Sequence, residues 1–375
     1  MAEVRKKLRK RVRVPETIQE IPKKTNKINK TTDSDEHTAK KIKEEAKPYT
    51  RGVSLTLDLT DMINNPLYSD IIITCKDGEE LNACKLLLSA RSEYFNKLFS
   101  STQQKAKESS SFHITNKIDL PELPSSAVKV VLEYLYTGNV SDETLTIDIL
   151  SDAYNGATVF SLSNLKEIIV QFMKTYMKHR HNVGSSNQIA KILSEVSDNS
   201  IITSSSDDNQ LIDEICRFLM SKSLYNIEYQ NLSSKALEFL LYHTLNMKEG
   251  NFVTPEYDVF KYCILWAVNQ ISKDDVLNFW LLIPNNEDFK AQESLSKEWN
   301  PIDSNNALLK QHRSAISSIL KSILKYIDFR LIHPNILANV IEPLEIVNPS
   351  ILIAAYRYQA QLNDGFVQTR RGIQG

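Results

Sequence analysis

The stretch YSDIIITCKDGEELNACKLLLSARSEYFNKLF, residues 68–99, decides the fold of this 375-residue chain. It begins with the apolar run Ile71–Ile73, which is followed by Asp77-Gly78, a dipeptide typical of tight turns. A second short strand is expected over Glu80–Cys84. The pattern therefore predicts a β-hairpin whose two strands are separated by a glycine turn.

The period of the apolar residues changes after this hairpin. Large apolar side chains recur at near-helical spacing from Leu88 onward, which predicts a helix over Arg91–Phe99. Strand, turn, strand and helix then form one compact unit with an apolar interior. No residue in it suggests catalysis.

The segment before the hairpin has two interpretations. Val53, Leu55, Leu57 and Leu59 alternate, which favours a strand, whereas Leu59, Met62 and Ile63 fit one face of a short helix. The sequence leaves both open. Asn64-Asn65-Pro66 ends the element in either case.

The segment after the hairpin unit alternates between loop, strand and helix. Residues 100–111 are polar and predict a surface loop, and 112–114 and 118–120 read as short strands. Pro124-Ser125 begins an amphipathic helix that ends before Gly138. Two further helices are expected over 145–157 and 162–177.

Residues 54–180 resemble a BTB/POZ domain. The resemblance rests on Asp70 with its apolar run, on the Leu-rich turn with Arg91-Ser92 and Tyr94-Phe95, and on Leu132–Gly138, LEYLYTG. Cys84 stands where that family usually has His before Lys85, and a packed thiol can replace an imidazole. The resemblance implies an α+β fold in which a short sheet is capped by a helical cluster, over residues 51–180.

Residues 181–345 return repeatedly to amphipathic helix. Helices are expected near 189–197, 210–221, 233–244, 256–270, 273–281, 305–326 and 334–341. Thr254-Pro255-Glu256 predicts an N-cap, a first-turn proline and a first-turn acid. Phe260–Ala267 and Ile327–Val340 resemble blocks of the all-helical BACK module that commonly follows a BTB domain. Residues 346–375 are expected to be a C-terminal tail.

Charge is unevenly distributed along the chain. Residues 1–50 hold 15 Lys and Arg against 8 Asp and Glu, and the remainder holds 30 against 38. The first 50 residues lack the apolar content that would offset ordering entropy, so we predict a disordered basic tail. Its dense cluster RKKLRKRVR is a candidate nuclear-import signal: Arg5, Lys6, Lys7, Arg9, Lys10, Arg11 and Arg13. Nucleic-acid binding is disfavoured, because no aromatic residues are interleaved with these charges.

The chain lacks the sequence patterns of the common enzyme sites. Neither HExxH, GxSxG, zinc-spaced Cys/His nor a glycine-rich phosphate loop is present. We therefore predict no catalytic residues, no metal, no cofactor and no small-molecule substrate. The four cysteines form no CxxC pair and suggest reduced thiols, and Cys75 and Cys84 could face one another across the hairpin. No apolar stretch of about eighteen residues predicts a membrane span.

The BTB resemblance implies two interaction surfaces. A twofold partner would cover the apolar first element, so the candidate dimer residues are Leu57, Leu59, Met62, Ile63, Asp70 and Lys85. Cullin-3 would dock near the end of the predicted Arg91–Phe99 helix. Its candidate contacts are Leu98, Phe99, Ala106, Glu108 and Tyr154.

Together these features predict a non-catalytic interaction protein, a dimeric BTB–BACK adaptor that tethers an unknown protein substrate to a cullin-3 ubiquitin ligase. The alternatives are a nuclear BTB protein in transcription and a dimeric scaffold without a ligase role. A cytoplasmic or nuclear location is expected in each case. Fungal proteins that resemble this one often carry a further SPRY or TLDc domain after BACK. The sequence leaves open whether such a domain is absent, or whether this chain is a fragment or a short isoform.

Overall fold

A computed structural model describes residues 51–108, 116–179, 183–199, 210–246, 252–293 and 300–361. The predicted basic tail with its import-signal candidates lies outside these residues, and so does the strand expected over 112–114. The described elements all belong to one compact unit, Arg51–Gly375.

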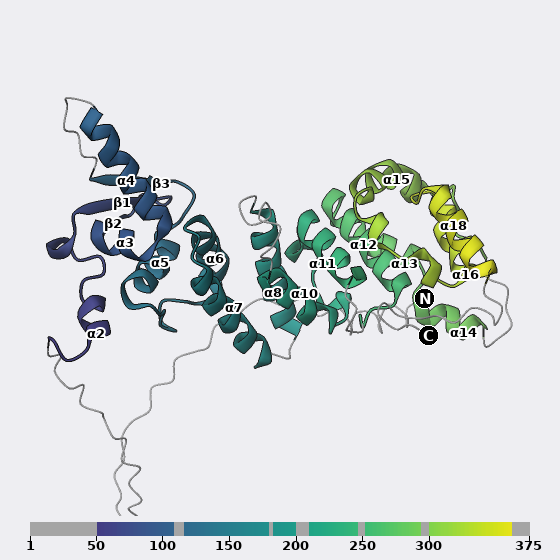
Figure 1. The fold of residues 1–375 in the computed structure, drawn as a ribbon. Coiled ribbons are helices and arrows are strands. Elements are labelled where there is room, and N and C mark those ends of the chain that lie inside the picture. The colour runs from purple at the N-terminus through teal and green to yellow at the C-terminus, as the bar shows by residue number, and fades with distance from the viewer. Residues whose placement is uncertain are drawn as a thin grey trace, which may run out of the picture. The chain divides into compact units, whose positions relative to one another are not determined.

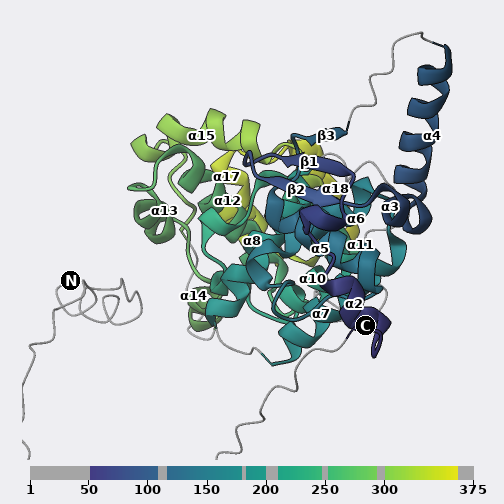
Figure 2. The ribbon, with the colours of Figure 1, turned by 90° about the vertical axis from the view of Figure 1, so that its left-hand side faces the viewer.

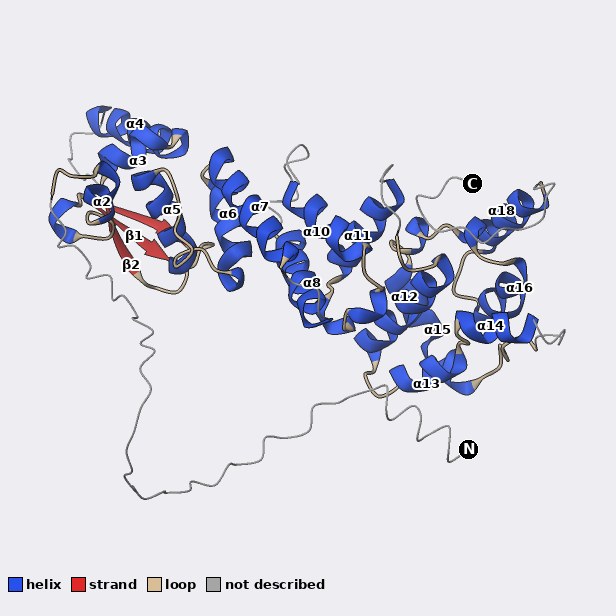
Figure 3. Cartoon of the chain, turned by 90° about the horizontal axis from the view of Figure 1, so that it is seen from below, coloured by secondary structure: helices blue, strands red, loops and turns tan. Residues whose placement is uncertain are grey.

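A three-stranded sheet forms the N-terminal part of this unit (Figure 3). Strand β1, Ile71–Cys75, lies between β2, Glu80–Ala83, and β3, Lys117–Leu120. It pairs antiparallel with β2 and parallel with β3. Gly78 adopts φ +80° in the turn between β1 and β2, a conformation that glycine tolerates without strain. The predicted hairpin is confirmed.

The register of this hairpin separates its two cysteines. Ile71 lies opposite Ala83, so Cys84 falls beyond the start of β1, while Cys75 lies beside the turn and donates its N–H to Glu79 O at 2.9 Å. The two thiols therefore do not face one another across the hairpin. Both are free, and burial raises the pKa of Cys75 to about 11.

Helices surround the sheet. They are α2, Leu55–Thr60; η1, Pro66–Tyr68; α3, Lys85–Arg91; α4, Glu93–Glu108; α5, Ser125–Thr137; η2, Ile147–Ile149; α6, Leu150–Val159; and α7, Ser163–Lys178. Helix α5 is the central one: nine of its thirteen residues are buried, and Gly138 ends it at φ +82°. The expected helices after Pro124 are therefore confirmed.

Two segments differ from the prediction. The single helix expected over Arg91–Phe99 is two helices, α3 and α4, which separate at Ser92, an extended residue with φ −138°. The surface loop expected from residue 100 is wrong at its start, because α4 continues to Glu108. Figures 1 and 2 show the last turns of α4 extending away from the sheet.

The rest of the described chain is helical. Its α-helices are α8, Val183–Asp198; α10, Gln210–Met220; α11, Ser234–Asn246; α12, Glu256–Ile271; α13, Val276–Leu282; α14, Asn286–Glu293; α15, Ala307–Leu320; α16, Pro334–Ile336; α17, Glu342–Leu344; and α18, Pro349–Ala360. Short 3₁₀ turns are η3, Leu224–Asn226; η4, Tyr229–Asn231; η5, Leu324–Tyr326; and η6, Phe329–Leu331. A π-turn, η7, spans Leu337–Ile341.

Helix α12 is the core of this helical region. Every residue from Val259 to Val268 is buried. Trp266 donates its indole N–H to Leu232 O at 2.9 Å, and Tyr262 donates its hydroxyl to Ile227 O at 3.1 Å. The Phe260–Ala267 block that resembles BACK therefore lies at the centre of the region.

The start of α12 differs from the prediction. Thr254 is not the cap of α12: its hydroxyl accepts the N–H of Leu224 at 3.0 Å, and Pro255 precedes the helix. Glu256 is the expected first-turn acid of α12; it is buried, and its carboxylate accepts the N–H of Asp328. Both groups join α12 to neighbouring turns.

The C-terminal tail expected from residue 346 is wrong as far as residue 361. Ile346 and Val347 are buried, and α18 follows, with the Asn348 side chain accepting the N–H of Ser350 at 2.9 Å. Leu352 and Ala355 of α18 are buried as well. The polar sequence after Tyr358 suggested a tail, although the helix itself, PSILIAAYRYQA, is largely apolar.

Lys261 is buried inside the helical region, with no exposed side-chain surface. Its ammonium group donates to Ile283 O and to Asn285 Oδ1, both at 2.7 Å, and lies 4.2 Å from the centre of the Trp280 ring. These contacts hold the C-terminal end of α13 against α12. A buried amine without such acceptors would be strongly destabilising.

Lys261 should make stability depend on alkaline pH. Burial lowers its pKa to about 8, whereas in the unfolded chain it stays near the ordinary value of about 10.4. Between these values the unfolded state holds a proton that the folded state has released, so raising the pH stabilises the fold. We expect the free energy of unfolding of the wild type, relative to Lys261→Met, to rise by about 2 kcal/mol between about pH 8 and pH 10. Urea unfolding of the wild type and of Lys261→Met across this pH range measures the difference. If the free energies of unfolding of the two proteins change with pH in the same way, the prediction is contradicted.

Candidate interaction surfaces

An exposed apolar surface lies at the start of the described chain. We call Val53, Leu55 and Leu57 the N-terminal apolar surface; their exposed fractions are 77%, 75% and 55%. Helix α2, which carries two of them, contains no buried residue. Leu67 and Leu86 are also largely exposed, at 83% and 75%. Several large apolar side chains left exposed on one domain are candidates for an interaction site.

Local hydrogen bonds position this surface. The Ser54 hydroxyl accepts the N–H of Leu57, and the Asp58 carboxylate accepts the N–H of Gly52 at 3.0 Å, which together hold the first turn of α2. Asn64, at φ +52°, accepts the N–H of Asn82 at 2.8 Å and so ties the following loop to β2. The open choice between strand and helix is thereby settled as helix.

The predicted dimer residues divide into two groups. Leu57 is exposed, whereas Leu59, Met62 and Ile63 are half-buried and pack against the core of their own domain. Helix α2 contacts α5 through this inner side. Val53 and Leu55 were missed as candidates, although the alternating pattern that contains them was visible in the sequence.

Asp70 and Lys85 both have partners inside the domain. Asp70 Oδ1 accepts the backbone N–H of Lys85 at 2.7 Å, and Lys85 Nζ donates to Asn116 Oδ1 at 2.9 Å. These bonds fix the start of α3 beside β1. A role for the two residues at a dimer interface stays a prediction.

An aromatic cluster supports the second predicted surface. Phe95 is buried and stacks on Phe160 at 4.8 Å between ring centres, and Phe99 lies 6.0 Å from Phe95. Leu98 and Phe99 are half-buried on α4. The main chain of Ala106 and Glu108 lies in the same helix, and their side chains are outside the described part.

Tyr154 is not on this surface. Its side chain is 1% exposed and points from α6 into the core, and Lys166 Nζ lies 5.7 Å from its ring centre. The expectation that it contacts a partner directly is wrong. Its position within an amphipathic segment did not reveal which side of α6 faces the core.

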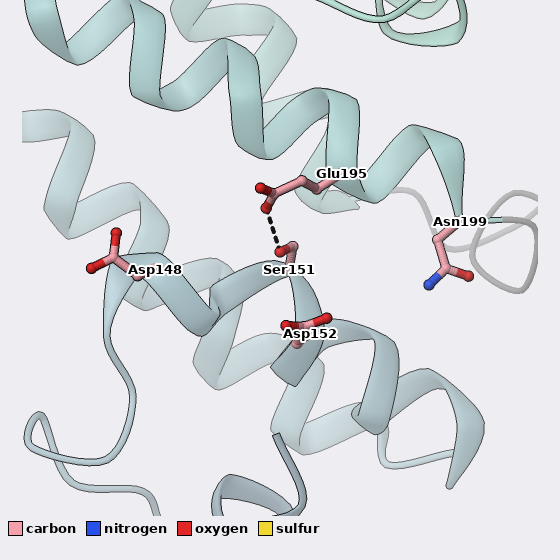
Figure 4. A pocket seen from close by; sticks show the side chains of 5 residues that line it. All are labelled: Asp148, Ser151, Asp152, Glu195 and Asn199. Carbon is pink, nitrogen blue, oxygen red and sulfur yellow. Dashed lines mark hydrogen bonds between the residues drawn. The ribbon is translucent and has the colours of Figure 1, made fainter. Parts of the chain in front are cut away.

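An acidic pocket of about 280 Å³ lies where α6 meets α8 (Figure 4). It is lined by Asp148, Ser151, Asp152, Glu195 and Asn199, and the Glu195 carboxylate accepts the Ser151 hydroxyl at 2.6 Å. Burial and the charge of Glu195 raise the pKa of Asp152. Within the described ranges, no three His, Cys, Asp or Glu side chains are grouped so that they could hold a metal ion.

In the described residues, no helix combines the length and the apolar character needed to cross a bilayer.

The small sheet with its helical cap matches a known family of domains. Residues 59–176 match the BTB/POZ domain family. This part of the chain is a BTB/POZ domain, as the hairpin and the LEYLYTG block suggested. Domains of this family are non-enzymatic interaction modules.

Several curated proteins are similar to the chain. Kelch repeat and BTB domain-containing protein 2 of cowpox virus (strain Brighton Red) is 28% identical over 122 residues, which are 32% of this chain and 20% of the viral protein. BTB/POZ domain-containing protein 9 of Drosophila melanogaster is 23% identical over 221 residues, 58% of this chain and 26% of that protein. Kelch-like protein 24 of Rattus norvegicus is 26% identical over 108 residues, 29% and 16% of the two chains.

The chain thus spans between about a sixth and a quarter of the length of these three relatives. Among solved structures, the BTB domain of human gigaxonin is 24% identical, with a TM-score of 0.24; the match covers 32% of this chain and 86% of that domain.

Proposed function

We propose that the chain is a dimeric BTB–BACK adaptor that tethers a protein partner to a cullin-3 ubiquitin ligase. The observation that carries this proposal is the exposure of Leu55 and Leu57 on α2, a helix with no buried residue beside a well-packed BTB core. Covering this surface with a second copy removes it from water and gives the twofold arrangement typical of homo-oligomers.

The helical region supports the adaptor part of the proposal. It resembles a BACK module over 181–345, and it packs directly onto the last helices of the BTB domain. Lys174 of α7 and Glu214 of α10 lie 3.2 Å apart, and Ser151 of α6 bonds to Glu195 of α8. A continuous stack of packed helices would hold a bound partner at a defined distance from the cullin.

Leu98 and Phe99 on α4 are the proposed cullin-3 contacts. They lie half-buried above Phe95, so a partner could cover them without unfolding the helix. The similarity to Kelch-like protein 24 supports this choice, because the BTB resemblance that implies cullin-3 binding extends to Kelch-like adaptors. The alternative is a nuclear role in transcription, suggested by the basic cluster Arg5–Arg13. This role also involves a dimer but requires no cullin-3 binding.

The immobilised full chain should retain cullin-3, and Phe99→Ala should weaken retention by about tenfold, because a buried aromatic anchor contributes more than about 1 kcal/mol. Phe218→Ala is the matched control, since Phe218 is also half-buried but lies in α10. A pull-down titrated with cullin-3 measures both. Absence of binding by the unmutated chain rejects the ligase role and leaves the transcriptional or scaffold alternatives.

A further inference from the structure

A groove of about 860 Å³ lies between α15 and the segment that leads into α18. One wall is a stripe of α15, and the other is the chain from Glu345 to Ile351. The Ser317 hydroxyl donates to Ile346 O at 3.2 Å and joins the two walls. The volume falls within the range of about 300–1,000 Å³ that is usual for ligand sites.

The groove is basic. Its lining includes four basic side chains and one acidic one: Lys310, Arg313, Lys321, Lys325 and Glu345. This contrasts with residues 51–375 as a whole, where acidic residues outnumber basic ones by 38 to 30. A concentration of positive charge on an acidic protein attracts a partner of negative charge.

Two of these cations are already paired. Arg313 forms an ion pair with Glu345 and donates to Ser304 O at 2.8 Å, and Lys325 lies 3.2 Å from Glu238. Lys310 and Lys321 are exposed and have no ion-pair partner among the described residues. These two lysines are therefore the groove's available charges.

The spacing of the two lysines indicates the shape of the ligand. They are eleven residues apart and lie on the same face of the helix, so they are separated by about 16 Å along its axis. A single phosphate cannot contact both, whereas an extended peptide covers this distance with about five residues. Nucleic acid carries about one charge per 1.7 Å and would leave most of its phosphates unmatched here.

The groove also offers contacts for the rest of such a peptide. Ser314 and Ser318 are exposed on the α15 wall and can donate hydrogen bonds to peptide carbonyl groups. Pro349 and Ile351 give the opposite wall an apolar part. The combination suits a segment in which acidic residues flank an apolar one.

We propose that this groove binds an extended acidic segment of a protein partner, with two carboxylates about five residues apart contacting Lys310 and Lys321. The inference rests on the proposed adaptor role and adds to it, because it places the recruited partner on the helical region and states its chemistry. No repeat domain is required for recruitment of this kind.

An array of nonapeptides tests the proposal. Each peptide carries two Glu residues, two to seven positions apart, in a background of Ser and Leu, and matched arrays carry Gln or Lys in their place. The full chain should bind the Glu array at least tenfold more tightly than the Gln array, with a maximum at a separation near five. Binding should weaken as ionic strength rises, because the lysines are exposed.

The double variant K310E/K321E should lose at least tenfold in affinity, and the neutral variant K310Q/K321Q should lose less. K235E/K273E is the matched control, because both lysines are exposed and lie outside the groove lining. Equal binding of Glu and Gln arrays, or equal loss in the control, would overturn the proposal. Dimerisation and cullin-3 retention, measured on the same variants, should not change. Failure of the peptide-binding proposal can therefore be distinguished from failure of the proposed adaptor function.

Discussion

Replacing Leu55 and Leu57 with aspartate should convert a dimeric chain into a monomer that remains folded. Fully burying a leucine contributes about 1.5–3 kcal/mol, and a twofold interface buries each of these residues twice. Aspartate there would also place four carboxylates in the interface. We expect the dissociation constant to rise at least about a hundredfold, since about 1.4 kcal/mol corresponds to each factor of ten.

The position of the two leucines makes this test specific. Both are in the first turn of α2, directly after the capping residue Ser54, where an acidic side chain favours the helix. Their exposure means that no packing inside the domain is lost. Sedimentation velocity and light scattering measure the mass, and thermal unfolding reports whether the domain remains intact.

Leu277→Asp with Leu281→Asp is the matched control. These residues are 55% and 64% exposed on α13 in the helical region, so the change in charge and in exposed apolar area is comparable. The control should remain dimeric. A dimeric L55D/L57D chain, or a monomeric control, means that the interface lies elsewhere.

Replacing Trp266 with alanine should destabilise the helical region by about 4 kcal/mol. Truncating a buried aromatic residue typically costs about 3–5 kcal/mol, because the cavity only partly closes. Trp266 is 2% exposed, and its indole N–H bonds to Leu232 O at 2.9 Å, so the variant also leaves that carbonyl without its donor. Urea unfolding followed by circular dichroism gives the change in the free energy of unfolding.

Two further variants separate the contributions. Trp266→Phe retains most of the ring volume and removes the N–H, so its cost should be closer to about 1–2 kcal/mol. Leu281→Ala removes an exposed side chain from the same region and should change stability by no more than about 0.5 kcal/mol. Similar losses for Trp266→Ala and Leu281→Ala contradict a central role of α12.

Elements with a strong local signal were predicted correctly from the sequence. Asp77-Gly78 defines a turn whose geometry depends on the glycine itself, and the helix before Gly138 combines regular apolar spacing with a glycine end. The BTB blocks lie in these same elements, which explains why the domain was recognised. Local chemistry and overall fold agree there.

Features that depend on tertiary contacts were predicted less well from the sequence. The extension of α4 beyond residue 100 and the helix α18 occur in polar or weakly periodic sequence, where composition suggested loop and tail. The sequence does not reveal that Glu256 and Lys261 are buried, because the backbone groups that pair with them belong to distant segments.

For this protein, the sequence alone determined the BTB/POZ domain and the helical character of the region after it, because turn glycines and apolar spacing act over a few residues. Only the tertiary structure decided which side of each helix is covered. It placed Tyr154 in the core, left Leu55 and Leu57 exposed, and brought the stripe of α15 beside the chain that enters α18. Burial depends on contacts between residues far apart in the chain. The apolar periodicity of a single sequence does not identify those contacts.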